Sequence, residues 1–543
     1  MTVHVSPAKV SATLDEAHVG DIQGAFGAIG QHDTGPRAGW KHRLVTLLAI
    51  LGPGLIVMVG DNDAGAFATY GQAGQNYGTT LLWTLALLIP VLYVNQEMVL
   101  RLGAVTGVGH ARLIFARFGR FWGAFSVIDL FLLNALTIVT EFIGISLALD
   151  YLGLDKTTGI ALSAGLIVTA VSTGDFRRFE RFAMVLVAAS FLLIPIYFLV
   201  HPPLAQVAHD FVVPQLPVGG KLSDVMLLII GIVGTTVAPW QLFFQQSYVI
   251  DKRITPRFIP YERFDLWIGI ALVVIGGGAI MAFTAATFAG QAEFGHFSDA
   301  GGLAAGIDKY VGHAAGVMFA IALIDAALIG ASAVSLSTAY AIGDVFSVRH
   351  SLHRKVTDAK GFYAVYGLLI AVSAGLVLTP GAPLGLLTLA VQVLAGVLLP
   401  SATVFLLLLC NDKAVLGPWA NTRALNVFTG AVIAALVILS VILTVAVLFP
   451  DATNDQLILG ILGGGGGMAA IVAVAILALG KKGMAANVSG DESRDTWRMP
   501  PLDRLAPAQL SLAAKAWMGA LRLYLAVAVG LVLFRIVMLA LRS

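Results

Sequence analysis

Two aspartates, Asp61 and Asp63, lie in the middle of a long apolar stretch near the N-terminus, with Gly60 and Gly65 on either side. Glycine lowers helix propensity, so a helix through this stretch is weakest where the acids lie. A carboxylate at the centre of a bilayer costs on the order of 3 kcal/mol unless it is paired or solvated. If the stretch crosses a membrane, the two acids predict a polar site in an interrupted helix. The alternative for either acid alone is a cap of the next half-helix.

A second stretch combines small residues, hydroxyls and a proline in a similar way. It reads Gly234-Thr235-Thr236-Val237-Ala238-Pro239-Trp240. Pro239 removes a backbone donor and frees a carbonyl. Non-helical backbone at membrane depth persists only where it is buried in protein or lines a cavity. Both stretches therefore predict interrupted helices that share a polar site at the bilayer centre.

The chemistry open to such a site is the binding of a hard cation. The aspartates offer anionic oxygens, and unwound carbonyls offer neutral ones, a ligand type that suits Mg²⁺, Mn²⁺ and Ca²⁺. No His or Cys lies near either stretch and no Met follows the two threonines, which disfavours Cu(I) and Zn²⁺. The candidate metal-binding residues are Asp63, Asp61, Gly60, Thr235, Ala238 and Gln392.

The composition requires a membrane around these residues. The chain has 543 residues, of which 58% are apolar and 12% charged, whereas a soluble domain has roughly 25% charged residues. A span needs about 20 mostly apolar residues. Such runs are found near 44–73, 79–100, 121–149, 157–173, 182–201, 224–249, 266–289, 314–343, 362–380, 384–410, 424–449, 456–480 and 517–541. The last run contains Arg522 and Arg535, and its alternative is an interfacial helix.

The distribution of Lys and Arg orients these spans. With the N-terminus in the cytoplasm, the outer loops of the twelve core spans hold only Lys156, Lys221 and Lys309, and the other basic residues fall inside. The predicted organisation is a cytoplasmic, mobile tail (1–42), a transport domain (43–480), a cytoplasmic linker (481–516) and a possible extra span (517–541), in the inner membrane. The first 40 residues lack the apolar core of a signal peptide.

The two interrupted spans are the first and the sixth. An offset of five spans is odd, so the two halves have opposite orientations, as in an inverted five-plus-five repeat whose broken helices form the substrate site. The sequence therefore predicts an all-α polytopic membrane protein with two five-span halves and additional C-terminal helices.

Two further polar side chains lie inside apolar spans. Glu141 in the third span is either a proton or ion relay or the donor or acceptor of a buried hydrogen bond between helices. Gln392 in the tenth span is either a neutral metal ligand or a residue that holds helices together through hydrogen bonds. For Glu97, Asp129 and Asp325 we expect packing or interfacial roles, because they lie nearer span ends or beside polar neighbours.

These residues resemble the Nramp divalent-metal transporters. Gly52-Pro53-Gly54, Asp63 and Gln72-Ala73-Gly74 resemble the family's first helix, and residues 234–241 its sixth, Gly-Ala-Thr-Val-Met-Pro-His-Asn. Arg101-Leu102-Gly103, the segment around Glu141 and the spacing from Gln392 to Pro400 resemble its second, third and tenth helices. The resemblance covers roughly residues 44–480. It implies a LeuT-like fold, alternating access and import of divalent metals.

The chain also departs from the family pattern. Asp63 matches the metal-binding aspartate of the family, but Ala64 and Ala66 replace its Pro and Asn, and Ala238 replaces its Met. Loss of a soft sulfur shifts preference toward harder ions, and magnesium-transporting relatives show a similar loss. Trp240 replaces a His linked to proton movement, Ile138 stands where the third helix usually has Asp, and the ninth span has no Arg. The coupling ion therefore stays open.

The expected function is secondary transport of divalent metal cations, with Mn²⁺ and Mg²⁺ ahead of Fe²⁺. The alternatives are an amino-acid or other organic-solute symporter of the same fold, whose carboxylate substrate two acids would repel, and a membrane scaffold or sensor, which gains nothing from costly buried acids. No nucleotide-binding loop or catalytic constellation indicates an enzyme, and Cys410 is the single cysteine. The expected partners are the metal, as substrate, and the lipid bilayer. We expect no resident cofactor and no nucleic acid, and the oligomeric state is not predicted.

Overall fold

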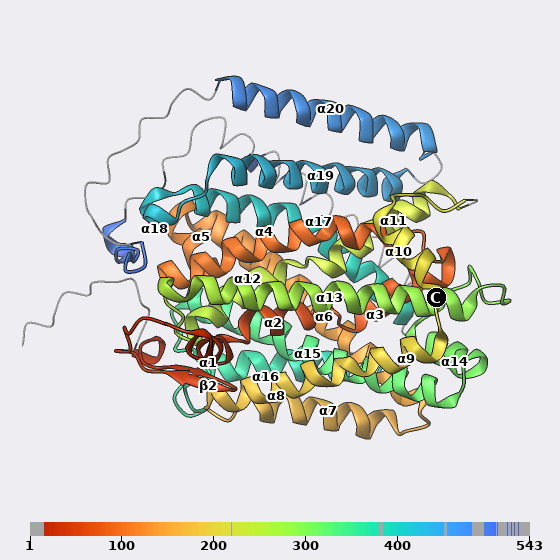
Figure 1. Cartoon of the computed structure of the whole chain (residues 1–543), viewed down its shortest axis with the longest axis horizontal. Helices are drawn as coiled ribbons and strands as arrows, with labels where there is room; N and C mark the ends of the chain where they lie inside the picture. Colours follow the sequence, from red (N-terminus) through yellow and green to blue (C-terminus); the bar gives the residue numbers. More distant parts are fainter. Residues whose placement is uncertain are drawn as a thin grey trace, which may run out of the picture.

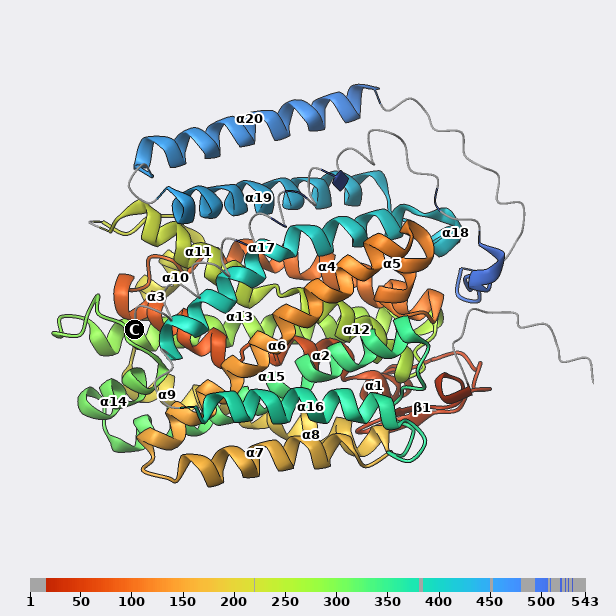
Figure 2. The ribbon, with the colours of Figure 1, turned by 180° about the vertical axis from the view of Figure 1, so that it is seen from behind.

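The computed structural model of the chain is a bundle of helices (Figures 1 and 2). It describes residues 16–479 apart from 219, 380–383 and 450–452, residues 494–505, and the isolated residues 508, 518, 519, 523, 526 and 530. The helices of ten or more residues are α1 (Trp40–Ile50), α3 (Ala64–Tyr77), α4 (Trp83–Thr106), α6 (Arg120–Tyr151), α7 (Lys156–Val171), α8 (Phe176–Ala189), α11 (Leu222–Thr236), α12 (Pro239–Asp251), α13 (Ile259–Phe288), α14 (Ala300–Tyr310), α15 (His313–Phe346), α16 (Lys360–Val377), α17 (Leu384–Asn411), α19 (Arg423–Leu448) and α20 (Asp455–Leu479).

Shorter elements connect or extend these helices. They are η1 (Glu16–His18), β1 (Ile22–Gly24), β2 (Gly27–Ile29), α2 (Pro53–Val59), α5 (His110–Phe118), η2 (Ser190–Leu192), α9 (Leu193–Val200), α10 (Leu204–Val212), η3 (Pro256–Phe258), α18 (Lys413–Leu416), η4 (Gly417–Trp419) and η5 (Leu502–Arg504). The two strands pair antiparallel in a single hairpin, with Gln23 opposite Ala28.

Each of the twelve predicted core spans coincides with helical structure. Nine helices of the described residues, counting α8 to α9 and α11 to α12 as one each, are long and apolar enough to cross a membrane. The first predicted span consists of α1, α2 and α3, and the fourth and twelfth coincide with the shorter apolar helices α7 and α20. The possible span at 517–541 and most of the linker at 481–516 lie outside the described residues.

The interrupted helices lie at the centre of the bundle. All seven residues of α2 and all thirteen of α12 are buried, as expected for helices that are enclosed on every side. They pack among α4, α13, α15 and α17, whereas α7 and α20 lie at opposite edges of the bundle (Figures 1 and 2). Large apolar side chains are exposed on the peripheral helices, among them Leu162, Leu368 and Ile471. The polar breaks are therefore far from lipid.

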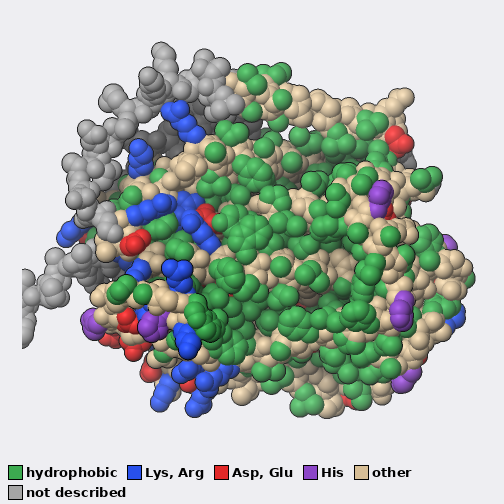
Figure 3. All heavy atoms as spheres, in the orientation of Figure 1, with side chains coloured by type: hydrophobic (Ala, Val, Ile, Leu, Met, Phe, Trp, Pro, Cys, Tyr) green, Lys and Arg blue, Asp and Glu red, His purple; other side chains and the backbone are tan. Residues whose placement is uncertain are grey.

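The two ends of the bundle differ in charge. On the face shown in Figure 3, Lys and Arg side chains gather at the end where the hairpin and α18 lie. Few appear at the opposite end, where α10 and α14 lie. An apolar band separates the two ends, as expected for a protein that crosses a bilayer.

From residue 16 onward the N-terminal segment contains regular structure, η1, β1 and β2, which the predicted tail did not include. The hairpin β1–β2 packs on α1, and a Cβ at Gly24 would lie 2.0 Å from the carbonyl oxygen of Ala49. At the turn of the hairpin, Ala25 N–H donates to Glu180 Oε2 at 2.5 Å and Arg181 donates to the Ala25 carbonyl at 3.2 Å. Short strands of small residues carry too weak a pattern to be recognised in the sequence.

Candidate functional site

The first break separates α2 from α3. Helix α2 ends at Val59. The amides of Asp61 and Asn62 then bond three residues back in place of four, and Asp61 N–H donates to the Met58 carbonyl at 3.3 Å. Asp63 is extended and caps α3, since its Oδ1 accepts from Ala66 N–H at 2.8 Å. The cap that was an alternative for Asp63 is therefore present. The cap uses Oδ1 of Asp63, so it does not prevent the carboxylate from also binding a metal ion.

Asp61 lies on the opposite side of this break and points toward the second one. Its side chain is 1% exposed, and Oδ1 accepts a hydrogen bond from Gln241 Nε2 of α12. Gln241 in turn accepts from Gln96 Nε2 of α4 at 2.7 Å. Among the described residues, Oδ2 of Asp61 has no hydrogen-bond partner. A buried anionic oxygen without a donor is costly, so this oxygen is available to a cation.

The second break lies at Val237 and Ala238, between α11 and α12. Pro239 is the first residue of α12, where its missing N–H costs nothing and its fixed φ favours the helix. Ala238 precedes it in an extended conformation, and its side chain makes no cap. Thr236 bonds to Tyr70 of α3 at 2.7 Å, whereas the Thr235 hydroxyl is buried and unpartnered within the described part of the chain.

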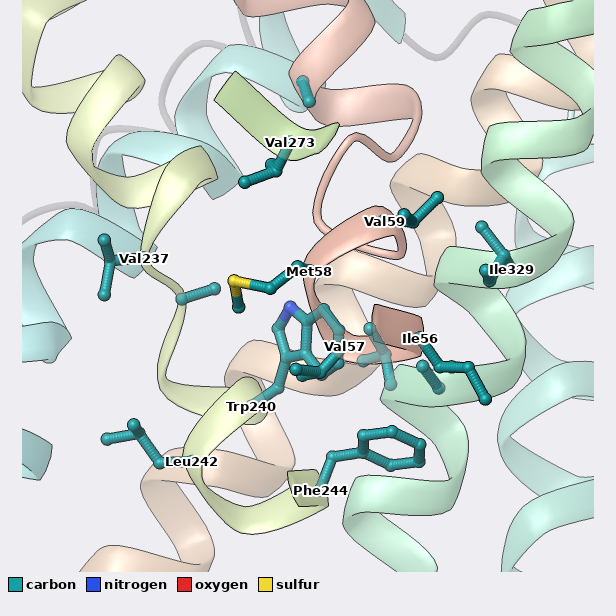
Figure 4. Packing of buried hydrophobic residues seen from close by; sticks show 14 of the residues in the cluster. Ile56, Val57, Met58, Val59, Val237, Trp240, Leu242, Phe244, Val273 and Ile329 are labelled. Carbon is teal, nitrogen blue, oxygen red and sulfur yellow. The ribbon is translucent and has the colours of Figure 1, made fainter. Parts of the chain in front are cut away.

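A tryptophan closes the space between the two breaks on one side. In Figure 4 the indole of Trp240 lies beside α2, close to Val57 and Met58. A Cβ at Gly60 would lie 3.7 Å from the Trp240 ring. The ring is 1% exposed, so it seals this side of the site against water. At this position the family pattern has His, which could have taken part in proton transfer, whereas an indole N–H only donates.

Glu141 and Gly330 form the wall behind Asp63. Glu141 of α6 accepts a buried hydrogen bond from Ala64 N–H at 3.1 Å, so it contacts the start of α3. A Cβ at Gly330 of α15 would lie 2.9 Å from Asp63 Cβ and from Glu141 Oε2. Only glycine therefore allows α15 to approach both acids. Oε1 of Glu141 lacks a partner among the described residues, so the bond to Ala64 does not satisfy the whole carboxyl group.

Gln392 of α17 reaches the start of α3. A Cβ at Gly65 would lie 1.7 Å from Gln392 Nε2, so the amide lies directly against the backbone next to Asp63. The backbone of α17 also touches the second break, because a Cβ at Gly234 would lie 2.1 Å from the Gln392 carbonyl oxygen. Gln392 Nε2 has no acceptor in the part of the chain that the structure describes. Gln392 is thus next to both breaks, and within the described residues its amide nitrogen does not join helices through a hydrogen bond.

The structure therefore brings all the predicted site residues together around the two breaks. No group of three or more His, Cys, Asp or Glu side chains in metal-binding positions occurs among the described residues. A metal would thus have two aspartates at most and would need neutral oxygens for its remaining ligands. A small cavity of about 10 Å³, room for about one water molecule, is lined by Ala64, Thr140 and Asp299 at the start of α14, among others.

Sequence reasoning missed several residues that shape this site. Gln241, Gln96 and Tyr70 connect the two breaks through hydrogen bonds, and Gly330 makes room for the acids. Amide side chains inside apolar spans were a usable signal for Gln96 and Gln241, as they were for Gln392. Tyr70 and Gly330 carried no signal, because tyrosine and glycine are ordinary in membrane helices.

Comparisons with known proteins agree with this architecture. The family model described as natural resistance-associated macrophage protein-like (Nramp) matches residues 54–446. The chain belongs to the Nramp family. The divalent metal cation transporter MntH of Ralstonia nicotianae is 32% identical over 406 residues, which cover 71% of this chain and 87% of that protein. MntH of Deinococcus radiodurans is 29% identical over 413 residues, 72% of this chain and 88% of the relative.

A solved Nramp structure shares the fold. The manganese transporter of Eremococcus coleocola, in complex with an aromatic bis-isothiourea compound, superimposes with a TM-score of 0.60 at 19% identity, over 87% of this chain and 98% of the transporter. The family match and this fold confirm the predicted LeuT-like architecture, with two five-span halves and additional C-terminal helices.

Proposed function

We propose that the chain transports divalent metal cations, Mn²⁺ and/or Mg²⁺ ahead of Fe²⁺, across the inner membrane by alternating access. The observation that carries this proposal is the buried Oδ2 of Asp61, for which the described residues provide no donor. The other oxygen of the same carboxylate, Oδ1, bonds to Gln241 of the second broken helix, and the Thr235 hydroxyl of that helix pair also has no partner among the described residues. Relatives named divalent metal cation transporters support the same substrate class.

The proposed ligands come from three helices. Asp61 and Asp63 neutralise the two charges of the ion, and the carbonyls of Gly60 and Ala238 with the Thr235 hydroxyl supply neutral oxygens. The oxygen of the Gln392 amide completes the set after rotation of the side chain away from Gly65. Such a set is hard and oxygen-only, which suits Mg²⁺ and Mn²⁺.

Ala238 favours a hydrated ion in this site. Its methyl group is 5% exposed and offers no ligand atom, in contrast to the thioether of the family pattern. The smaller side chain leaves room for a water molecule on the ion, and Mg²⁺ keeps waters because it dehydrates reluctantly. We therefore expect this chain to discriminate less strongly against Mg²⁺ than relatives with a methionine.

An organic-solute symporter remains the alternative function. Its substrate would bring a carboxylate to the positive end of a half-helix. Asp61 and Asp63 repel such a group, and the cavity of about 10 Å³ beside Ala64 is far smaller than the pockets that hold organic solutes. Both properties favour a small cation.

The orientation that we propose places the N-terminus and the hairpin in the cytoplasm, because Lys and Arg gather at that end. The cavity beside Asp299 then lies on the outer side of the breaks, and in this proposal the ion enters from that side. Glu141, whose Oε1 has no hydrogen-bond partner among the described residues, is the proposed proton relay next to Asp63.

Uptake into proteoliposomes, with Mn²⁺, Mg²⁺ and Ca²⁺ in competition, tests this function. We expect saturable Mn²⁺ uptake that Mg²⁺ inhibits, and an Asp61→Asn variant at least tenfold slower, because the amide keeps the shape but loses the charge. Asp325→Asn is the matched control, since Asp325 is also a buried acid in a span with one unpartnered oxygen among the described residues. Equal loss in both variants, or uptake of amino acids in place of metals, would refute the proposal.

A further inference from the structure

The junction between α1 and α2 lies eight residues before the metal-binding break and is held by charged side chains from other helices. Lys252, at the end of α12, donates to the carbonyls of Ile50 and Leu51 at 2.7 and 2.9 Å and to Glu180 Oε1 of α8 at 2.6 Å. These three bonds use all the protons of its ammonium group. The positive charge lies at the negative end of α1, where it is stabilised by the helix dipole.

Asp265 of α13 binds the free backbone amides at the start of α2, whereas Lys252 binds the free carbonyls at the end of α1. Its oxygens accept from Gly52, Gly54 and Leu55 N–H at 3.2, 2.7 and 3.3 Å. Gly52 has a φ of +155°, and a Cβ there would lie 2.3 Å from Glu180 Oε1. The Gly-Pro-Gly sequence thus permits a sharp junction, bent by 53° between the two helices, against the Glu180–Lys252 pair.

The donors around these groups fix their charges. Among the described residues, Glu180 accepts from Lys252 and from Ala25 N–H of the hairpin, and Asp265 accepts only from amides. A carboxyl group that only accepts is satisfied as a carboxylate. Glu180, Lys252 and Asp265 therefore carry a net charge of −1 in a place where each side chain is fully buried.

Glu262 of α13 is the fourth member of this group, which we name the junction cluster (Glu180, Lys252, Glu262 and Asp265). It lies three residues before Asp265, on the same helix face, and its side chain is 0% exposed. The charged groups that face it are Asp265 on its own helix, Lys252 from α12 and Glu180 from α8. Neither of its oxygens has a hydrogen-bond partner within the described residues.

An ionised Glu262 would raise the cluster to a net charge of −2 without a single donor to its own oxygens. Desolvation of an unpaired carboxylate costs several kcal/mol, and such groups take up a proton instead. The oxygens of Glu180 and Asp265 already accept from protein donors, so they are poor ligands for a metal ion. A proton needs no further ligands.

We propose that Glu262 is a proton-binding site that controls the cytoplasmic gate. The carboxyl group holds its proton while α1 and α2 are packed against the junction cluster. When they move away, water reaches Glu262, its O–H bond breaks, and the proton leaves as hydronium on the cytoplasmic side. The carboxylate that remains is hydrated, and it opposes closure until it is protonated again. This inference depends on the proposed orientation but not on the identity of the transported ion.

A reporter cysteine on α2 tests the proposal without metal transport. In a Cys410→Ser background, which removes the single cysteine, Val57→Cys places a thiol on a residue that is 0% exposed in the closed junction. Its labelling by a membrane-impermeant maleimide from the hairpin side, in metal-free buffer, measures how often the gate opens. We expect labelling to increase as the pH on that side rises from 6 to 8.

Glu262→Gln is the matched variant, because glutamine resembles the protonated acid and cannot titrate. Dividing the labelling rate of the parent by that of Glu262→Gln at each pH cancels the ionisation of the thiol itself. We expect this ratio to rise about tenfold from pH 6 to pH 8. Glu262→Met, a second side chain of similar length that cannot titrate, should give the same ratio and replaces Glu262→Gln if that variant does not fold.

Two results would overturn the proposal. A ratio that stays constant with pH would show that Glu262 does not titrate in the gate. A ratio that follows the Na⁺ concentration at fixed pH would assign the site to a sodium ion. Mn²⁺ uptake measured separately distinguishes the two proposals, since pH-dependent labelling without uptake would reject the transport function and leave the proton site intact.

Discussion

The first span is interrupted twice, at residues 51–52 and 60–63, and the two interruptions differ in how their polar groups are satisfied. At the junction of α1 and α2, Lys252 donates hydrogen bonds to the free carbonyls, and Asp265 accepts hydrogen bonds from the free amides. At the break between α2 and α3, Oδ2 of Asp61 has no partner among the described residues. The backbone groups at the first interruption are satisfied by protein side chains, whereas we expect the free oxygen at the second to be satisfied by a ligand.

This difference separates a structural interruption from a binding site. Both have glycine, buried charge and broken helix, so neither composition nor burial distinguishes them. Counting the hydrogen-bond donors and acceptors at each interruption does distinguish them. Unsatisfied buried polar groups are rare in folded proteins, so they indicate a place where a ligand binds. By the same count Glu262 is the exception at the junction, which is why we assign it a proton.

Removal of charge at Asp63 should have the largest effect on function. Asp63→Ala removes a proposed ligand and the cap of α3, and the lost cap alone costs about 1 kcal/mol. Asp63→Asn keeps the cap, since asparagine caps as well as aspartate, and removes only the charge. We expect both variants to lose Mn²⁺ uptake by more than a hundredfold in proteoliposomes. Uptake at the parental rate by Asp63→Asn would show that Asp63 serves only as a cap.

Lys252→Ala should have the largest effect on stability. It leaves Glu180 and two carbonyls buried without their donor, and breaking a buried ion pair costs about 3–5 kcal/mol. Lys156→Ala is the control, because Lys156 also pairs with an acid, Asp150 at 3.0 Å, but at the surface, where such pairs contribute little. Denaturant unfolding in detergent measures both. Equal stability of the two variants would contradict our interpretation of the junction as a satisfied structural unit.

Ala238→Met should alter selectivity without abolishing transport. A thioether beside the two aspartates adds a soft ligand and removes space for water, so preference moves away from Mg²⁺ and Ca²⁺ and toward Mn²⁺. We expect the concentration of Mg²⁺ that halves Mn²⁺ uptake to rise about tenfold. Ala64→Met, at the neighbouring helix start, is a control for added bulk. An unchanged competition series would refute the role of position 238 in ion choice.

Much of the fold could be predicted from the sequence, because a helix that crosses a bilayer needs a long apolar run and such runs can be counted. The twelve core spans were predicted from length and hydropathy alone, and the breaks from glycine, proline and buried acids. The hairpin at residues 22–29 was missed, since two strands of three residues are shorter than any periodic pattern that can be recognised.

The sequence was sufficient to predict which residues form the site, but not which hydrogen bonds they make. Asp61, Asp63, Thr235 and Gln392 stood out because polar groups are costly at membrane depth. Which polar atom is left without a partner depends on contacts between distant segments, such as Gln241 with Asp61 and Glu180 with Lys252. No local pattern encodes these contacts, so the sequence alone could not distinguish the two interruptions.

Substitution of the two threonines next to the second break, Thr235 and Thr236, should have the smallest effects and compares an unpartnered hydroxyl with a bonded one. Thr235→Val removes an unpartnered hydroxyl from a buried place, so stability should stay the same or rise slightly. Thr236→Val leaves the Tyr70 hydroxyl without its partner at 2.7 Å and should cost about 1–3 kcal/mol. Transport should show the reverse order, with Thr235→Val several-fold slower for Mn²⁺ at subsaturating concentrations, because the proposed ligand is lost.

Purified variants in detergent and in proteoliposomes would provide both measurements on the same samples. A Thr235→Val variant that is destabilised would mean that its hydroxyl is bonded within the protein, and the count of free oxygens at the break would fall by one. A variant with parental stability and parental uptake would remove Thr235 from the ligand set and leave Asp61 as the unpartnered group on which the comparison of the two interruptions depends.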